Sequence, residues 1–172
     1  MSPERIGAVV PFALAGQTTA EVVVSHYGAG QVYPPFSVPV ASTAPAIFTE
    51  SQNGGGQGSF IHYPSNSHNS ADNPAPAGSA VTFFATGEGV WDDTIQDGSV
   101  SVGVRHFVTK AVSLTVGSQP ARILYAGAVP YQAGRLQINA ILPDGISSGP
   151  QPVVLKIGEA DNAQQRVTIE IK

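Results

Sequence analysis

The chain has 172 residues, of which 8 are Lys or Arg and 12 are Asp or Glu, and its formal net charge is −4. Scattered basic residues argue against nucleic-acid binding, and the absence of cysteine excludes disulfides and thiolate metal sites. No apolar run reaches the ~18 residues of a transmembrane helix, so we expect no membrane span. Charged residues are only 12% of the chain, with 19 Gly and 14 Pro, which indicates a turn-rich chain with an apolar core.

The N-terminal segment has two interpretations. Arg5 precedes an apolar run at 6–14 that ends near the small residues of Ala13-Leu14-Ala15, a pattern typical of a secretory signal peptide. Glu4, in the would-be basic region, and the similarity of this segment to an internal one favour a strand. We expect a strand, with the signal peptide as the alternative.

One pattern occurs twice. Residues 7–11 (GAVVP) are similar to residues 139–143 (NAILP), and each copy continues into an apolar strand, at 21–25 and at 153–157. Each copy then closes with an alternating strand whose apolar residues share one face: Phe36, Val38 and Val40 in the first copy and Val167, Ile169 and Ile171 in the second. Such a repeat indicates one β supersecondary unit used twice.

The repeat predicts the domain organisation. We expect 1–43 to hold the C-terminal strands of a partial immunoglobulin-like domain, and 44–172 to form a complete immunoglobulin-like sandwich. The boundary is placed in the small-residue and Pro stretch at 41–45. A partial domain leaves an apolar face and unpaired strand edges that something must cover. Three covers fit the sequence: the second domain, strands from upstream sequence, or a neighbouring copy that adds strands in trans.

A long polar segment follows at 49–78. Its Asn, Ser and Gly content predicts little apolar burial and a mobile or ligand-binding loop. His62 and His68, with Asp72 nearby, are a conceivable metal set, but we favour polar loop residues that form local turns. Asp92, Asp93 and Asp97 do not have EF-hand spacing, and we favour turn-forming acids there. We expect no metal and no cofactor.

Period-two alternation predicts strands at 80–86, 100–104, 112–116, 122–126 and 136–142, with Gly, Pro, Asp and Asn turns between them. Short strands at this spacing predict an all-β, antiparallel immunoglobulin-like sandwich. The inward positions predict a core of Val81, Phe83, Leu114, Val116, Ile123, Leu136, Ile138, Val153, Leu155, Ile157, Val167 and Ile169.

Trp91 is the only tryptophan and stands beside Asp92 and Asp93. An aromatic ring next to carboxylates can stack on a sugar, but a single large aromatic more often seals the end of a sandwich, and we favour sealing. The candidate ligand-binding residues on the sugar interpretation are Trp91, Asp92, Asp93, His62, Tyr63, His68 and Asp72.

Five phrases carry a resemblance to a known family: APAIFT (44–49), NPAPAGSAVTFFATGEG (73–89), VGSQPARILYAG (116–127), LQINAILP (136–143) and SGPQPVVLKIG (148–158). In these the chain resembles the uncharacterised immunoglobulin-like C-terminal domain family of large secreted proteins from soil acidobacteria, similar in style to IPT/TIG domains. Family members normally carry further strands upstream of the segment that begins here at Ile6. The resemblance implies an extracellular or cell-surface bacterial module and brings no catalytic residues.

The sequence favours a protein that is not an enzyme. Residues 145–149 (GISSG) fit the letters of a nucleophile elbow, but a strand follows them where that motif needs a helix. We therefore expect a structural or adhesive module that self-assembles into a fibre by strand complementation, with a carbohydrate-binding accessory module as the alternative. Its expected partners are a neighbouring immunoglobulin-like domain or another copy of itself, and a glycan on the alternative interpretation.

Overall fold

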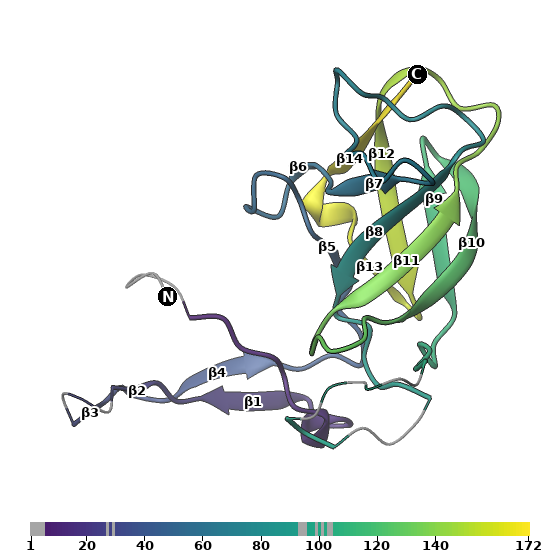
Figure 1. The fold of residues 1–172 in the computed structure, drawn as a ribbon. Helices are drawn as coiled ribbons and strands as arrows, with labels where there is room; N and C mark the ends of the chain where they lie inside the picture. Colours follow the sequence, from purple (N-terminus) through teal and green to yellow (C-terminus); the bar gives the residue numbers. More distant parts are fainter. Residues whose placement is uncertain are drawn as a thin grey trace.

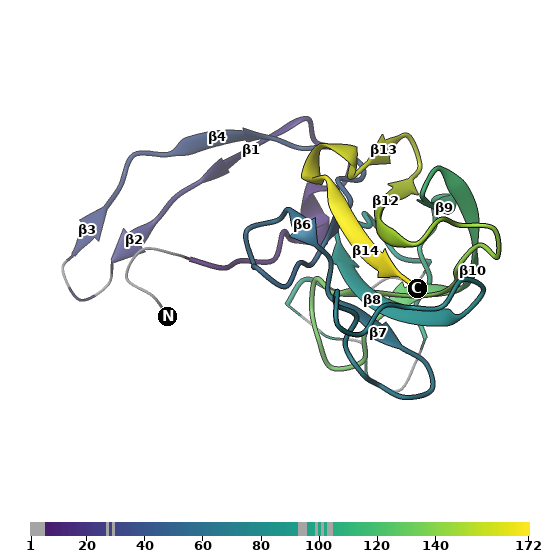
Figure 2. The same ribbon diagram turned by 90° about the horizontal axis from the view of Figure 1, so that it is seen from above.

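The computed structural model describes residues 6–26, 28, 30–92, 96–98, 100, 102 and 105–172, and the fold of these residues is all-β. A curled sheet of ten strands forms the body of the molecule, and a narrow hairpin arm projects from it (Figures 1 and 2). None of the described segments forms a helix that is long and apolar enough to cross a bilayer. The arm contains η1 (Phe12–Leu14), β1 (Thr19–Val22), β2 (Ser25–His26), β3 (Gln31–Val32) and β4 (Phe36–Pro39).

The curled sheet begins in the middle of the chain. Its elements are β5 (Ala46–Ile47), β6 (Gly56–Gln57), β7 (Phe60–His62), β8 (Ala80–Thr86), β9 (Val112–Val116), β10 (Gln119–Ala128), β11 (Leu136–Ile141), β12 (Gly149–Ile157), β13 (Ala160–Asp161), the 3₁₀ turn η3 (Ala163–Gln165) and β14 (Val167–Ile171). The strand order is β5-β8-β11-β10-β9-β12-β14-β6, with β7 paired to β8 and β13 to β12.

Alternation of apolar and polar residues produces the strands that the sequence predicted. In β8, β11 and β14 every second side chain is buried, which is the pattern of a strand with one face on a core. All predicted core residues except Ile123 are 0–2% exposed, and Ile123 is partly buried against the same cluster. The core also contains residues that alternation did not indicate: Ile47, Phe60, Ala75 and Trp91.

Two long strands curl the sheet. Residues 119–121 of β10 pair with β9, whereas residues 122–128 pair with β11, with a register shift inside this pairing between Ile123 and Tyr125. In the same way, residues 149–152 of β12 pair with β14 and residues 153–157 pair with β9. One half of each long strand pairs with β9, and the other half pairs with β11 or β14 on the far side of the core. The sheet therefore folds over its own apolar face and encloses the core.

The expectation of a purely antiparallel sheet is wrong at one edge. β14 pairs with β6 in parallel, with Val167 opposite Gly56 and Thr168 opposite Gln57. Gly58 lets the chain after β6 lie close to β14, because a Cβ at this position would lie 2.3 Å from the Phe60 ring and 2.8 Å from Val167 Cγ1. The glycine-rich stretch at 54–58 is therefore part of the sheet edge.

Two predicted strands are not found as expected. Residues 7–11 form no strand, and their side chains lack the covering sheet that the similar residues 139–143 have; Val9 and Val10 are 57% and 69% exposed. In the predicted strand 100–104, residues 100 and 102 are not in a strand, and the others lie outside the described residues.

Candidate functional site

The arm contains an antiparallel strand pair, β1 with β4, that can be compared with another antiparallel pair in the same chain, β12 with β14. β1 and β4 pair over four positions, from Thr19 opposite Pro39 to Val22 opposite Phe36. β12 and β14 also pair over four positions, from Gly149 opposite Ile171 to Pro152 opposite Thr168. Both copies of the predicted repeat thus contain an antiparallel pair, but the pairing differs, because residues 153–157, the counterpart of 21–25, pair with β9 and not with β14.

The two hairpins differ in what covers their apolar face. Val22 opposite Phe36 and Ala20 opposite Val38 place four apolar side chains on one face of the arm. Phe36 is 68% exposed and Val22 is 46% exposed, whereas Val167, Ile169 and Ile171 of β14 are all at 2% or less. Among the described residues nothing shields the apolar face of the arm as the core shields β14.

The backbone edges of the arm are also unpaired. The Val40 amide donates to the Thr18 carbonyl at 2.9 Å, and antiparallel alternation then points the N–H groups of Glu21 and Ser37 away from the hairpin. In the described part of the chain, the arm strands β1 and β4 pair only with each other. Each side of the arm is thus an edge that could accept another strand.

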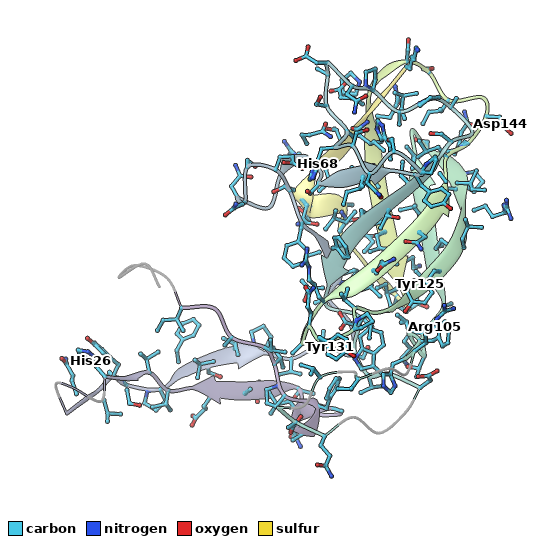
Figure 3. The ribbon with its side chains drawn as sticks, viewed as in Figure 1. His26, His68, Arg105, Tyr125, Tyr131 and Asp144 are labelled. Atoms are coloured by element: carbon cyan, nitrogen blue, oxygen red, sulfur yellow. The ribbon has the colours of Figure 1, made fainter. Side chains whose placement is uncertain are left out.

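The base of the arm is fixed to the curled sheet. The Phe12 ring packs against the core of the sheet, and the Phe12 and Ala13 amides donate to the carboxylate of Asp97, in the loop between β8 and β9, at 2.5 and 3.2 Å. After the end of β4, the buried Thr43 hydroxyl donates to the Ile157 carbonyl of β12 at 2.8 Å. The shaft of the arm projects beyond these anchors, with His26 near its tip (Figure 3).

Edges of the curled sheet, in contrast, are closed by side-chain amides. The Asn69 Oδ1 accepts from the Glu170 amide at 2.9 Å, and Asn69 Nδ2 donates to the Glu170 carbonyl at 2.8 Å, so one side chain satisfies the backbone of β14. In the same way, Gln165 Oε1 accepts from the Ile47 amide of β5 at 2.7 Å, and Gln165 Nε2 donates to the Ile47 carbonyl at 3.1 Å. Sequence reasoning missed both residues because their partners are 101 and 118 positions away.

The polar segment 49–78 is built into the fold, and the expectation of little apolar burial there is wrong. It contains β6 and β7, and Phe60, Asn69 and Ala75 are each at most 1% exposed. The Ala75 amide donates to the Glu170 carbonyl, and the Lys172 amide donates to the Ala75 carbonyl, both at 2.9 Å. Hydrogen bonds to β14 therefore order a stretch whose composition resembles that of a mobile loop.

His62 and Tyr63 line a pocket of about 410 Å³ that is open to solvent, here called the polar cavity, together with other residues of this segment, Ser79 and Lys172. His62 Nε2 is 3.1 Å from Asn69 Nδ2, an obligatory donor, so this nitrogen accepts and the His62 proton resides on Nδ1. Burial lowers the pKa of His62, which keeps the ring neutral. Tyr63 is 69% exposed and presents its ring to solvent.

His68 and Asp72 do not join His62 in a metal site. His68 Nδ1 lies 3.4 Å from Glu50 Oε1, and the Ser59 hydroxyl donates to the same oxygen at 2.6 Å. The hydrogen bond from Ser59, with a smaller contribution from His68, lowers the pKa of Glu50. Asp72 is exposed in the turn bridged by Ser70 and Asn73. No group of three or more His, Asp or Glu side chains in the described residues is arranged to hold a metal ion.

The Trp91 cluster has a structural role. Trp91 is 9% exposed, belongs to the core and forms a β-bridge with Val108, so it seals the sheet as the favoured interpretation predicted. Asp92 exchanges hydrogen bonds with Phe107: its amide donates to the Phe107 carbonyl and its carboxylate accepts from the Phe107 amide, both at 3.0 Å. Asp93, the remaining predicted ligand-binding residue, lies outside the described residues.

No protein-family model, curated protein or solved structure matches the chain. The resemblance to the acidobacterial domain family therefore stays a prediction from the sequence. The arm and the polar cavity are the two features from which a function can be argued.

Proposed function

We propose that this chain is a non-catalytic, immunoglobulin-like structural or adhesive module of an extracellular or cell-surface protein, and that another copy of the chain covers its arm. The observation that carries the proposal is the exposed apolar face of the arm, whereas the apolar side chains of the counterpart strand β14 are buried in the same chain. The curled sheet, which closes over one core through β10 and β12, supports the immunoglobulin-like sandwich as its architecture.

The partner for the arm is another arm. Asn69 and Gln165 occupy backbone groups at the edges of the curled sheet, so an incoming strand would have to displace them. The arm offers unpaired edges, an apolar face with Val22 and Phe36, and only one charged residue in its strands β1 and β4, Glu21, which points to the opposite face. Two such faces can meet without bringing like charges together.

Strand addition between arms would be open-ended. Each arm has two free edges, one along β1 and one along β4, so a contact that uses one edge leaves the other available. A contact that does not close on itself propagates into a fibre. The anchors at Asp97 and Thr43 would carry the curled sheet along the side of such a fibre.

Light scattering across a concentration series tests the proposal. The wild type should increase in mass beyond a dimer, and Phe36→Ser should weaken each contact by about 1 to 2 kcal/mol, or roughly tenfold, because 68% of that side chain is available for burial. Leu124→Ser is the matched control, since Leu124 is 52% exposed on β10, away from the arm.

A second pair of variants separates strand pairing from simple apolar contact. Ser37→Pro removes an outward N–H from β4 and should block strand addition while the inner ladder of the arm persists. Ser37→Ala keeps the N–H and should assemble like the wild type. A monomer at every concentration, or assembly that is equally sensitive to Leu124→Ser, would refute the proposal. A mass that stops at a dimer would refute the fibre.

A further inference from the structure

The polar cavity beside His62 is remote from the arm. Lys172, which lines the cavity, lies at the end of the curled sheet opposite the arm, where Figure 1 marks the C-terminus. The cavity measures about 410 Å³, within the range of about 300–1,000 Å³ that is usual for small-molecule sites. Its lining includes His62, Tyr63, Ser65, Ser67, Asn73 and Lys172.

The walls of the cavity have a fixed backbone. The Tyr63 amide donates to the Ala80 carbonyl at 3.0 Å, which ties this wall to β8. The Lys172 amide donates to the Ala75 carbonyl at 2.9 Å, and the Asn73 amide donates to the Ser70 carbonyl at 3.0 Å. A ligand would therefore meet a largely preformed site.

The polar groups of the cavity match vicinal hydroxyls. The Ser65 and Ser67 hydroxyls are 2.9 Å apart, and Asn73 Nδ2 donates to Ser67 Oγ at 3.1 Å. Each serine hydroxyl can donate and accept, and the neutral His62 holds its proton on Nδ1, 3.5 Å from Ser67 Oγ. Such a row of closely spaced donors and acceptors suits the hydroxyl groups of a sugar ring.

The cavity also has an apolar surface and one positive charge. Tyr63 exposes 69% of its surface, and Pro74 and Pro76 line the same cavity. An exposed aromatic ring offers a flat face on which the C–H groups of a sugar can stack. Lys172 has the only positively charged side chain among the described residues that line the cavity, and none of these residues has an acidic side chain.

We propose that this cavity binds one unit of an acidic saccharide, such as a uronic acid residue. The sugar ring stacks on Tyr63, its hydroxyls bond the Ser65, Ser67 and His62 side chains, and its carboxylate faces Lys172. This set of residues differs from the sugar site that the sequence suggested, because Trp91 is buried and Asp92 is bonded to Phe107.

The test is calorimetric titration of the full chain with an oligogalacturonate and with a neutral galacto-oligosaccharide of equal length. The acidic oligomer should bind more tightly, and its affinity should fall as salt is added. Tyr63→Ala should weaken binding about tenfold through loss of stacking. Lys172→Gln should weaken it about two- to fivefold and reduce the salt dependence, as expected for a solvent-accessible ion pair.

Matched controls make these losses specific to the cavity. Tyr131 is 68% exposed, nearly the same fraction as Tyr63, so Tyr131→Ala removes an equivalent ring elsewhere. Lys110→Gln changes the net charge by the same amount as Lys172→Gln and lies outside the cavity. Both controls should bind like the wild type.

Three results would overturn the proposal: no binding of either oligomer, equal binding of the neutral one, or equal losses in the Tyr63 and Tyr131 variants. Assembly through the arm is measured separately with Phe36→Ser. That variant should retain wild-type affinity for the oligogalacturonate, so the two proposals can fail independently.

Discussion

Replacing Asn69 with alanine should destabilise the whole curled sheet, although Asn69 is a polar residue in a segment of loop-like composition. Asn69 is 1% exposed, and its side chain forms hydrogen bonds with both backbone groups of Glu170, with the side-chain amide of Gln57 and with the His62 ring. Alanine removes all of these bonds and uncovers the edge of β14 beside the parallel strand β6.

The magnitude follows from the Glu170 amide. A buried donor that loses its only partner costs about 1–3 kcal/mol, and the Glu170 carbonyl keeps its hydrogen bond from the Ala75 amide, so we expect a loss of about 1–3 kcal/mol. Gln57 and His62 are only partly buried, and they can turn to water at small cost. Against a total stability of about 5–15 kcal/mol, this is a large effect.

Urea denaturation followed by Trp91 fluorescence measures the change. Asn73→Ala is the control: Asn73 is an exposed asparagine in the same segment, its Nδ2 donates to Ser67 Oγ and to the His68 carbonyl, and we expect a change of about 0.5 kcal/mol. Hydrogen exchange should show the Asn69 and Glu170 amides protected in the wild type. Equal free energies of unfolding for the Asn69 and Asn73 variants would show that the amide does not hold the edge.

Three further substitutions test separate parts of the structure. Ile138→Ala should cost about 2–5 kcal/mol of unfolding free energy, because Ile138 is fully buried, and a change below about 0.5 kcal/mol would contradict its place in the core. Gly58→Ala should cost about 1–3 kcal/mol in the same assay through its clash with Phe60 and Val167, whereas Gly7→Ala, with open space around it and no positive φ, should change stability little. Burial raises the pKa of Glu88 above 4.5, so the folded chain retains a proton that the unfolded chain releases, and stability falls as pH rises through the raised pKa. Glu88→Gln should remove this dependence and be the more stable protein at neutral pH; a variant that is stabilised equally at acidic pH would contradict the assignment.

The strands and most of the core could be predicted because both depend on a local pattern. Side chains two positions apart share a face, so alternation in β8 or β14 identifies the buried set without knowledge of the partner strand. The same reasoning failed for residues 7–11, which have the apolar character of a strand but pair with no other strand among the described residues. Alternation of apolar residues predicts which face of a strand would be buried, but it does not predict whether another element packs against that face.

The candidate sites could be predicted only in part, because their geometry depends on distant partners. His62 and Tyr63 were among the predicted ligand-binding residues, but Lys172 reaches the same cavity from the end of the last strand, and no local pattern links them. Asn69 has the sequence context of a mobile loop, and its backbone partner is in β14. Trp91 could seal the core or stack on a ligand until its burial was known.

The strand pairs β1–β4 and β12–β14 show that the local sequence determines strand pairing, whereas burial of the apolar face depends on neighbouring elements. β1–β4 and β12–β14 have the same type of ladder, yet the second has its apolar side chains in the core and the first exposes Phe36. An isolated two-stranded hairpin is only marginally stable in water, and the anchors at Asp97 and Thr43 hold the base of the arm but not its shaft. The shaft therefore needs a partner to be as stable as its counterpart. Amide exchange within β1 and β4 should be fast in dilute protein and slow where light scattering detects assembly. Equal amide exchange in dilute and in assembled protein would mean that the arm is stable without a partner, and this result would contradict the proposal that a second chain covers the arm.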